Sequence, residues 1–201
     1  LERRHEDFVR GGAALTEAQK VRIREINTEM SKLGTQFGQN VLAEVNASAI
    51  VVDTRAELAG MSDEQVAGAA EAAKARGLEG KYVIALLNTT GQPAEAQLQN
   101  RALRERLHKA SVARGSRGGQ YDNTAIVSKV LKLRAERAKL LGYDTSANFV
   151  LADETAGNQD NVNKMLRQLA PAAVANARRE AADLQAMIDK EQKAKGQPTF
   201  K

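Results

Sequence analysis

The chain has 201 residues, a formal net charge of +5 from 30 basic and 25 acidic residues, and no cysteine. The lack of cysteine excludes disulfides, thiolate metal sites and cysteine nucleophiles. Basic and acidic side chains are interspersed without a block of like charge, and no apolar run approaches the ~18 residues of a membrane span, so we expect neither nucleic acid nor membrane as a partner.

The first predicted helix begins at Thr16, which with Gln19 forms a capping-box pattern. Apolar residues then recur at helical spacing, and the helix is expected to extend to Val45. The stripe consists of Ile23, Ile26, Met30, Leu33, Phe37 and Val41. Gly34 and Gly38 lie inside this helix and each costs about 1 kcal/mol against alanine. We expect close packing against another backbone to compensate for that cost.

Two β-branched runs, at residues 49–52 and 81–87, are the only segments that favour strands. They flank a helix that opens with a second capping box, Ser62 to Gln65, and ends at Gly77. So few strand residues predict one small β-ribbon inside a mainly α protein.

A turn is expected at residues 88–93, followed by helix carrying Leu98, Leu103 and Leu107. Residues 114–119 contain three glycines and are predicted to be the most mobile internal loop.

The next helix is predicted to be capped by Asp122 or Asn123 and to stop at Gly142. Its apolar stripe comprises Ile126, Val130, Leu133 and Leu140, with Val127 and Leu141 beside it. Another helix is expected from Thr145 or Ser146.

Asp160 is predicted to open a last long helix that ends before Gly196. Pro171 lacks a backbone donor, so a kink or break is expected at Ala170. If the chain is one lobe of a larger enzyme, it should expose an apolar patch of more than about 600 Å² that includes Leu184 and Ile188.

The two histidines do not form a zinc motif. His5 and Glu6 begin like His-Glu-x-x-His, but Val9 occupies the fifth position, and His108 stands alone. A zinc site on a helix needs two histidines one turn apart. We therefore predict no catalytic and no metal-binding residue in this chain, and no bound cofactor; substrate-contacting residues are left unassigned.

Other chemistry-bearing patterns favour ordinary structural roles. Asp63-Glu64 and Asp153-Glu154 are sequence neighbours, so they diverge on a helix and do not form an acid–base pair. Residues 115–119 follow a helix rather than a strand, which argues against a phosphate-binding loop.

Six segments in order resemble the N-terminal half of bacterial peptidyl-dipeptidases of the thimet-oligopeptidase-like family of zinc metallopeptidases. They are residues 8–16, 33–40, 50–62, 78–93, 100–107 and 131–154. The resemblance implies a mostly helical, two-lobed hydrolase with a deep channel. In that family a zinc ion is held by the two histidines of His-Glu-x-x-His and a downstream glutamate, and dipeptides are released from peptide C-termini. None of those positions occurs here.

We therefore expect a mainly α fold: residues 1–201 form the helical N-terminal lobe of such an enzyme, with one small β-ribbon. The chain starts without methionine and is expected to be a fragment that lacks the catalytic half and is inactive alone. Expected partners are that catalytic half, short peptides and, through the exposed surface between lobes, a second copy. Zinc is expected only in the full-length parent. The expected compartment is the cytoplasm, with periplasm or export as the alternative. The alternative function is a free-standing helical protein-interaction domain without enzymatic activity.

Overall fold

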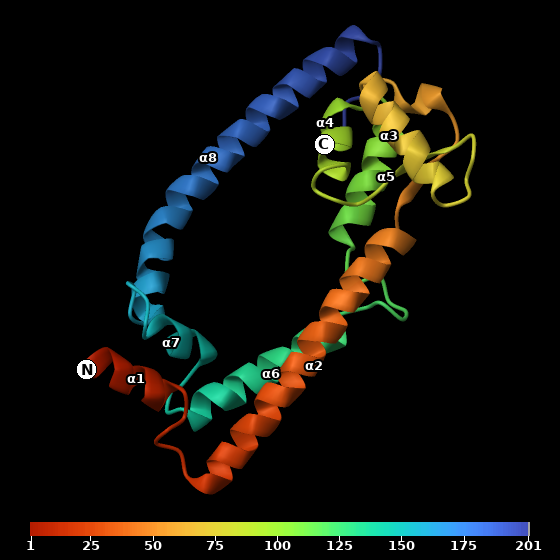
Figure 1. Ribbon diagram of the computed structural model, residues 1–201. Helices are drawn as coiled ribbons and strands as arrows, with labels where there is room; N and C mark the ends of the chain where they lie inside the picture. The colour runs from red at the N-terminus through yellow and green to blue at the C-terminus, as the bar shows by residue number, and fades with distance from the viewer. Residues whose placement is uncertain (201) are drawn as a thin grey trace. The chain divides into compact units, whose positions relative to one another are not determined.

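The computed structural model describes residues 1–200 and is mainly helical, as predicted (Figure 1). Within those residues it contains eight α-helices, one 3-10 helix and one two-stranded sheet. In chain order the elements are α1 (Glu2–Arg10), α2 (Glu17–Ala47), β1 (Ile50–Val52), η1 (Arg55–Leu58), α3 (Asp63–Lys74), β2 (Tyr82–Ile84), α4 (Gly91–Gln97), α5 (Arg101–Val112), α6 (Thr124–Leu140), α7 (Ser146–Leu151) and α8 (Gln159–Ala194).

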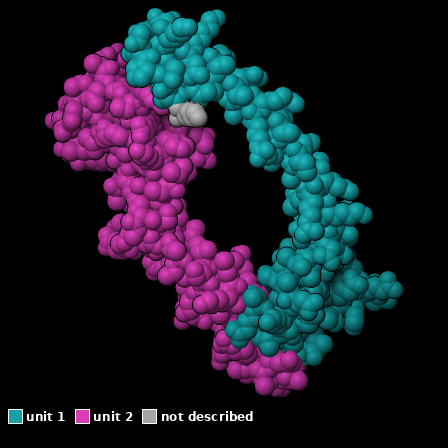
Figure 2. Space-filling model, turned by 180° about the vertical axis from the view of Figure 1, so that it is seen from behind, with its two compact units in different colours: residues 1–15, 135–201 teal, residues 16–134 magenta. Residues whose placement is uncertain are grey.

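The described residues form two compact units, which Figure 2 colours separately. Unit 1 contains residues 1–15 and 135–200, and unit 2 contains residues 16–134. The boundary falls inside α6, whose first eleven residues belong to unit 2. The assignment of residues 1–201 to one enzyme lobe stays a prediction.

The hydrophobic core of unit 2 lies around the β-ribbon. The two strands pair antiparallel, with Ile50 opposite Ile84 and Val52 opposite Tyr82, which confirms the predicted ribbon. The core residues come from β1, η1, α3, β2, α4 and α5 and the short segments beside them. They are Val52, Leu58, Val66, Ala69, Ile84, Leu86, Ala94, Leu98, Leu103 and Leu107. A side chain in such a core touches many others, so this cluster holds the short elements in place.

One glycine allows two segments of unit 2 to cross in contact. Gly60 has φ +101°, and a Cβ built on it would lie 2.1 Å from the carbonyl oxygen of Gln97. Beside it, the amide of Gln99 donates to the carbonyl of Ala59 over 2.8 Å. Only glycine can adopt this conformation at such close range.

The helix starts predicted from capping patterns are confirmed. Thr16 and Gln19 exchange hydrogen bonds at the start of α2, and Ser62 and Gln65 do the same at α3. In both cases a side-chain oxygen accepts from a backbone amide that has no partner inside the helix.

The expected compensation at the α2 glycines is not found. A Cβ added at Gly34 or at Gly38 would meet no heavy atom within 4 Å among the described residues. The prediction of close packing there is wrong within the described residues.

The turn predicted at residues 88–93 is shorter than expected. Gly91 already belongs to α4, whose last residue is Gln97. A new helix, α5, then starts after Asn100, whose side chain accepts from the amide of Leu103. Leu103 and Leu107 lie on α5, whereas Leu98 lies between the two helices, so the single helix expected here is divided into two.

Unit 1 is organised around an aromatic ring. The guanidinium of Arg10 lies 4.8 Å from the ring centre of Phe149, and that of Arg137 lies 5.3 Å from it. Tyr143 meets the same ring edge-on at 5.3 Å. These cation–π and edge-to-face contacts hold α1, the end of α6 and α7 together.

The end of α6 and the start of α7 agree with the predictions made from the sequence. Gly142 has φ +85°, and the amide of Tyr143 donates to the carbonyl of Ala138, which is a glycine-terminated helix end. The helix α7 starts at Ser146, as predicted, and Thr145 caps it by accepting from the amide of Asn148.

The last helix differs from its prediction at its start and at Pro171. Its cap is Asn158, not Asp160, and the helix is not broken at Pro171, while the alternative of a kink stays a prediction. The missing proline donor removes one hydrogen bond from a helix of 36 residues, and the rest of the ladder is retained.

No residue of α8 is buried, although all of them are described. Leu184 is 60 % exposed and Ile188 is half-buried. Over residues 1–200, moreover, none of the helices is long and apolar enough to cross a membrane.

Candidate functional site

The two histidines lie in different units, and neither joins a catalytic arrangement. His5 is on α1 in unit 1, where it borders a shallow hollow with Glu6 and Asp153. His108 is on α5 in unit 2, with Nδ1 3.8 Å from a carboxylate oxygen of Glu95. His108 is two-thirds exposed, so this contact is a solvent-screened surface pair.

Of the two neighbouring carboxylate pairs, only Asp63-Glu64 lies on a helix, α3; Asp153-Glu154 lies in the turn after α7, so the prediction of a helix there is wrong. Asp63 binds the guanidinium of Arg55 over 2.5 Å at the exposed start of α3. Asp153 borders the hollow next to α1 in unit 1.

The side chains present do not fit a zinc site. Across residues 1–200, no three or more His, Cys, Asp or Glu side chains converge where they could hold a metal ion. The family resemblance implies zinc, but a zinc site needs three protein ligands at least.

A buried charged group in unit 2 is the carboxylate of Glu44, on α2. Its side chain is 7 % exposed, and its two oxygens accept from the amide of Gly115 at 2.6 Å and from Nε of Arg117 at 2.7 Å. Arg117 also donates to the carbonyl of Ala110. A buried carboxylate needs such charge-assisted partners to offset its desolvation.

A second carboxylate holds the loop on its other side. Asp122 accepts from the amide of Gly118 over 2.7 Å and from the amide of Thr124 over 2.8 Å. Hydrogen bonds from the hydroxyl and amide of Thr124, and then from the Gly118 amide, lower the pKa of Asp122 below its ordinary value of 3.8. Asp122, one of the two residues predicted to cap α6, therefore accepts a hydrogen bond from the first residue of that helix, Thr124. The predicted mobility of residues 114–119 stays a prediction.

Two buried asparagines join α2 to α6 beside this loop. The amide of Asn40 donates to Oδ1 of Asn123 over 2.9 Å, and Asn123 donates in turn to the carbonyl of Phe37. Both side chains are almost fully buried, so each hydrogen bond is costly to lose.

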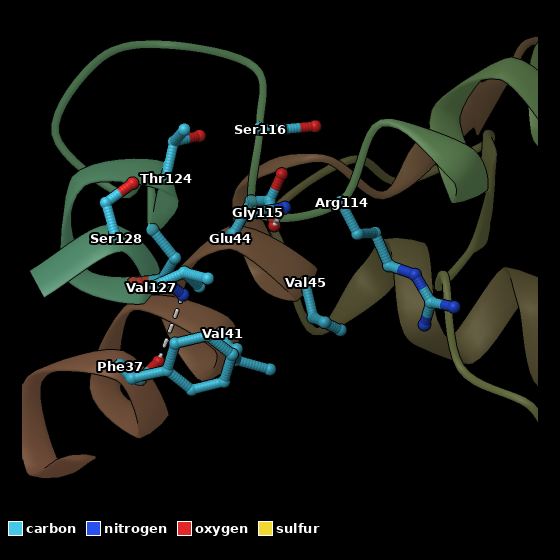
Figure 3. A pocket seen from close by; sticks show the side chains of 11 residues that line it. Phe37, Val41, Glu44, Val45, Arg114, Gly115, Ser116, Thr124, Val127 and Ser128 are labelled. Atoms are coloured by element: carbon cyan, nitrogen blue, oxygen red, sulfur yellow. Dashed lines mark hydrogen bonds between the residues drawn. The ribbon is translucent and has the colours of Figure 1, made fainter. Parts of the chain in front are cut away.

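A hollow of about 540 Å³ lies next to this junction (Figure 3). Phe37 and Val41 line it from α2, and Val127 lines it from α6. Arg114 borders it but extends away from Phe37 and donates to the carbonyl of Leu86. The full lining is Phe37, Val41, Glu44, Val45, Arg114, Gly115, Ser116, Asn123, Thr124, Val127 and Ser128.

The hollow is suited to binding rather than to catalysis. Its exposed lining is mainly apolar, and Ser116, Thr124 and Ser128 add hydroxyl groups to it. Its carboxylate, Glu44, already accepts two hydrogen bonds and is not placed to take a proton from a reactant. An apolar side chain is the group this surface can receive.

Glu44 was not identified from the sequence. The one signal was an acidic residue inside an apolar stripe, between Val41 and Val45. Its partners follow 71 and 73 residues later, and no local pattern connects such distant positions.

The sequence of this chain is similar to those of known peptidases. Residues 95–200 match the sequence profile described as "Peptidase family M3". The chain is 41 % identical over 188 residues to a dipeptidyl carboxypeptidase of Escherichia coli strain K12, a match that covers 94 % of this chain and 28 % of the relative. It is 33 % identical over 189 residues to an oligopeptidase A of Haemophilus influenzae, with 92 % of this chain and 28 % of that relative covered.

A more distant relative is a mitochondrial intermediate peptidase of Phaeosphaeria nodorum, 27 % identical over 174 residues. That match covers 82 % of this chain and 19 % of the relative. The chain therefore spans less than a third of the length of each of these three peptidases.

Proposed function

The chain belongs to peptidase family M3, and from that premise we propose that it is a helical part of a longer peptidase that removes C-terminal dipeptides from short peptides. The observation that carries this proposal is the 41 % identity, along 94 % of the chain, to a protein named dipeptidyl carboxypeptidase. The match covers 28 % of that relative, which leaves most of its length for the reacting groups.

In this proposal the chain forms part of a wall of the substrate channel and supplies shape rather than chemistry. Two features support that role: the metal-ligand side chains needed for zinc do not converge among the described residues, and none of the residues of α8 is buried. We assign the zinc ion, the catalytic groups and the peptide-binding machinery around them to the remaining polypeptide.

The chain alone is expected to be inactive on peptides. The test uses a tetrapeptide with a blocked N-terminus, incubated with this chain, with this chain plus zinc, and with the part of the E. coli relative that lies outside the matched stretch. Dipeptide release is expected only when that part and this chain are both present. Release by this chain alone, abolished by a chelator, would refute the proposal.

The same assay separates the proposal from a free-standing interaction domain. If the remaining part of the relative is fully active without this chain, the channel-wall role is wrong. The compartment stays a prediction: the relatives include one named as cytosolic and one named as organellar.

A further inference from the structure

The hollow beside Glu44 is one end of a longer groove. A second hollow, of about 280 Å³, lies further along the same two helices, and Phe37 and Val127 line both. The second hollow is lined by Leu33, Gly34, Phe37, Ile126, Val127, Val130, Leu131 and Arg134. We call the two together the α2–α6 groove. From Leu33 to Val45 it follows α2 for roughly 18 Å, at 1.5 Å per residue.

The groove exposes apolar side chains from both helices. Phe37 is 41 % exposed on α2, and Leu131 is 58 % exposed on α6. Val41 and Val127 are also exposed, and all four side chains line the α2–α6 groove. A continuous row of such side chains marks an interaction surface, whereas single ones are ordinary.

The α2 glycines lie on this side of the helix. Gly34 lines the second hollow, and Gly38 is one turn further on. A side chain at either position would meet nothing within 4 Å among the described residues, so their cost to the helix is not offset inside the chain. We call Gly34 and Gly38 the glycine notch of α2. A second helix that crosses α2 at this notch would approach its backbone closely, and that packing would offset the cost of the two glycines.

Two arginines without an ion pair among residues 1–200 border the groove: Arg114, which donates to the carbonyls of Leu86 and Ser111, and Arg134. At the end near Glu44 the carboxylate is already neutralised by Arg117. At the other end Arg134 is exposed, and within residues 1–200 it makes no ion pair. A segment that occupies the groove should therefore carry a carboxylate at that end.

We propose that the α2–α6 groove holds an amphipathic α-helix from the remaining part of the longer peptidase. Its apolar side chains, spaced three and four residues apart, enter the two hollows, and an acidic side chain faces Arg134. Rows of side chains at i±4 on α2 leave grooves that accept the ridge of a second helix. The inference rests on the proposed function, because it takes the partner from the part of the relatives that this chain does not match.

A second copy of the chain fits this surface less well. In a symmetric dimer the groove faces itself, and its one carboxylate, Glu44, is already paired with Arg117, so no carboxylate is available to face Arg134.

The test co-expresses this chain with the tagged part of the E. coli relative that lies outside the matched stretch, and measures the dissociation constant of the pair. Gly34→Leu should weaken binding by at least about tenfold, because overpacking a close contact is destabilising. Gln39→Leu is the matched control: it adds the same side chain to α2, on the face turned away from the groove, and should change the constant by less than about twofold.

The charge is tested separately on α6. Arg134→Glu should weaken binding by about tenfold, since it places like charges together. Lys132→Glu makes the same charge change away from the groove and should have little effect. Circular dichroism of each variant alone is expected to match that of the wild-type chain, which excludes misfolding as the cause.

The outcomes distinguish this inference from the function it rests on. If the wild-type chain does not bind the rest of the relative, the proposed function and the inference both fail. If it binds but the groove variants behave like their controls, the inference alone is overturned. Sedimentation that shows a dimer abolished by Gly34→Leu would identify a second copy as the occupant and would also overturn it.

Discussion

The two longest helices among the described residues, α2 and α8, are built alike and buried differently. Both begin with a side-chain cap, and both carry apolar residues at helical spacing over eight turns or more. Yet α2 buries Ile23, Ile26, Asn40 and Glu44, whereas α8 buries none of its 36 residues.

The difference shows that an amphipathic pattern does not by itself decide what a helix covers. The apolar side of α8 includes Leu166, Leu169 and Leu184, all at least half exposed. In proteins most helix stability comes from packing of the apolar face. We infer that α8 and the groove side of α2 are surfaces for the same longer polypeptide, and that the rest of unit 2 is complete in itself.

The largest effect is expected when equal truncations are compared in the two regions. Leu107 on α5 is fully buried in the unit 2 core, so Leu107→Ala should lower the free energy of unfolding by about 4 kcal/mol. Leu184→Ala on α8 should lower it by less than about 0.5 kcal/mol. Urea unfolding followed by circular dichroism measures both. Similar losses at the two sites would contradict the contrast drawn here.

The next effect is expected at Glu44. Glu44→Ala leaves the Arg117 guanidinium and the Gly115 amide without their acceptor, and it should cost about 3 kcal/mol of unfolding free energy. Glu191 on α8 pairs with Lys195 in solvent, so Glu191→Ala should leave the unfolding curve unchanged. Thermal melts of both variants give the comparison. Equal shifts in melting temperature would show that Glu44 contributes no more to stability than an exposed carboxylate.

The glycines of α2 test the exposure of that helix through an expected gain of stability instead of a loss. In the chain alone, Gly34→Ala and Gly38→Ala should each raise the free energy of unfolding by about 1 kcal/mol, because a Cβ there meets nothing. Gly60→Ala should instead lower it, since the added Cβ would collide with the Gln97 carbonyl. A loss of stability at Gly34 would mean that the notch is filled within the chain.

The smallest effect is a dependence on pH at Asp122. Hydrogen bonds lower its folded pKa, so its contribution is present above the unfolded value of 3.8 and is lost as the pH falls through the folded pKa. The melting-temperature difference between wild type and Asp122→Asn should therefore shrink as the pH falls from 6 to about 2. A difference that stays constant over that range would assign the effect to another group.

Local chemistry predicted most of the elements. The caps at Thr16, Ser62 and Thr145 and the stop at Gly142 each depend on residues within one helical turn, so the sequence displays them directly. The uninterrupted α8 shows the limit of such rules, because a long helix retains its remaining hydrogen bonds around Pro171.

The candidate site could not be predicted in the same way. The pairing of Glu44 with Arg117, and that of Asn40 with Asn123, join residues more than seventy positions apart. Which of the many polar residues on α2 becomes buried depends on where α6 packs, and no spacing rule encodes that. Family membership was accessible from the sequence, since it rests on segments in order along the chain.

The separation between Glu44 and its partners also sets an order of events during synthesis. When α2 leaves the ribosome, the Glu44 carboxylate is still in water, because Gly115 and Arg117 are 71 and 73 residues behind it. At ordinary rates of translation that interval is roughly 4 to 15 s. We infer that burial of Glu44 is a late step that closes unit 2. Arrested chains that end before Gly115 should leave the second half of α2 open to protease, and chains that extend past α6 should protect it.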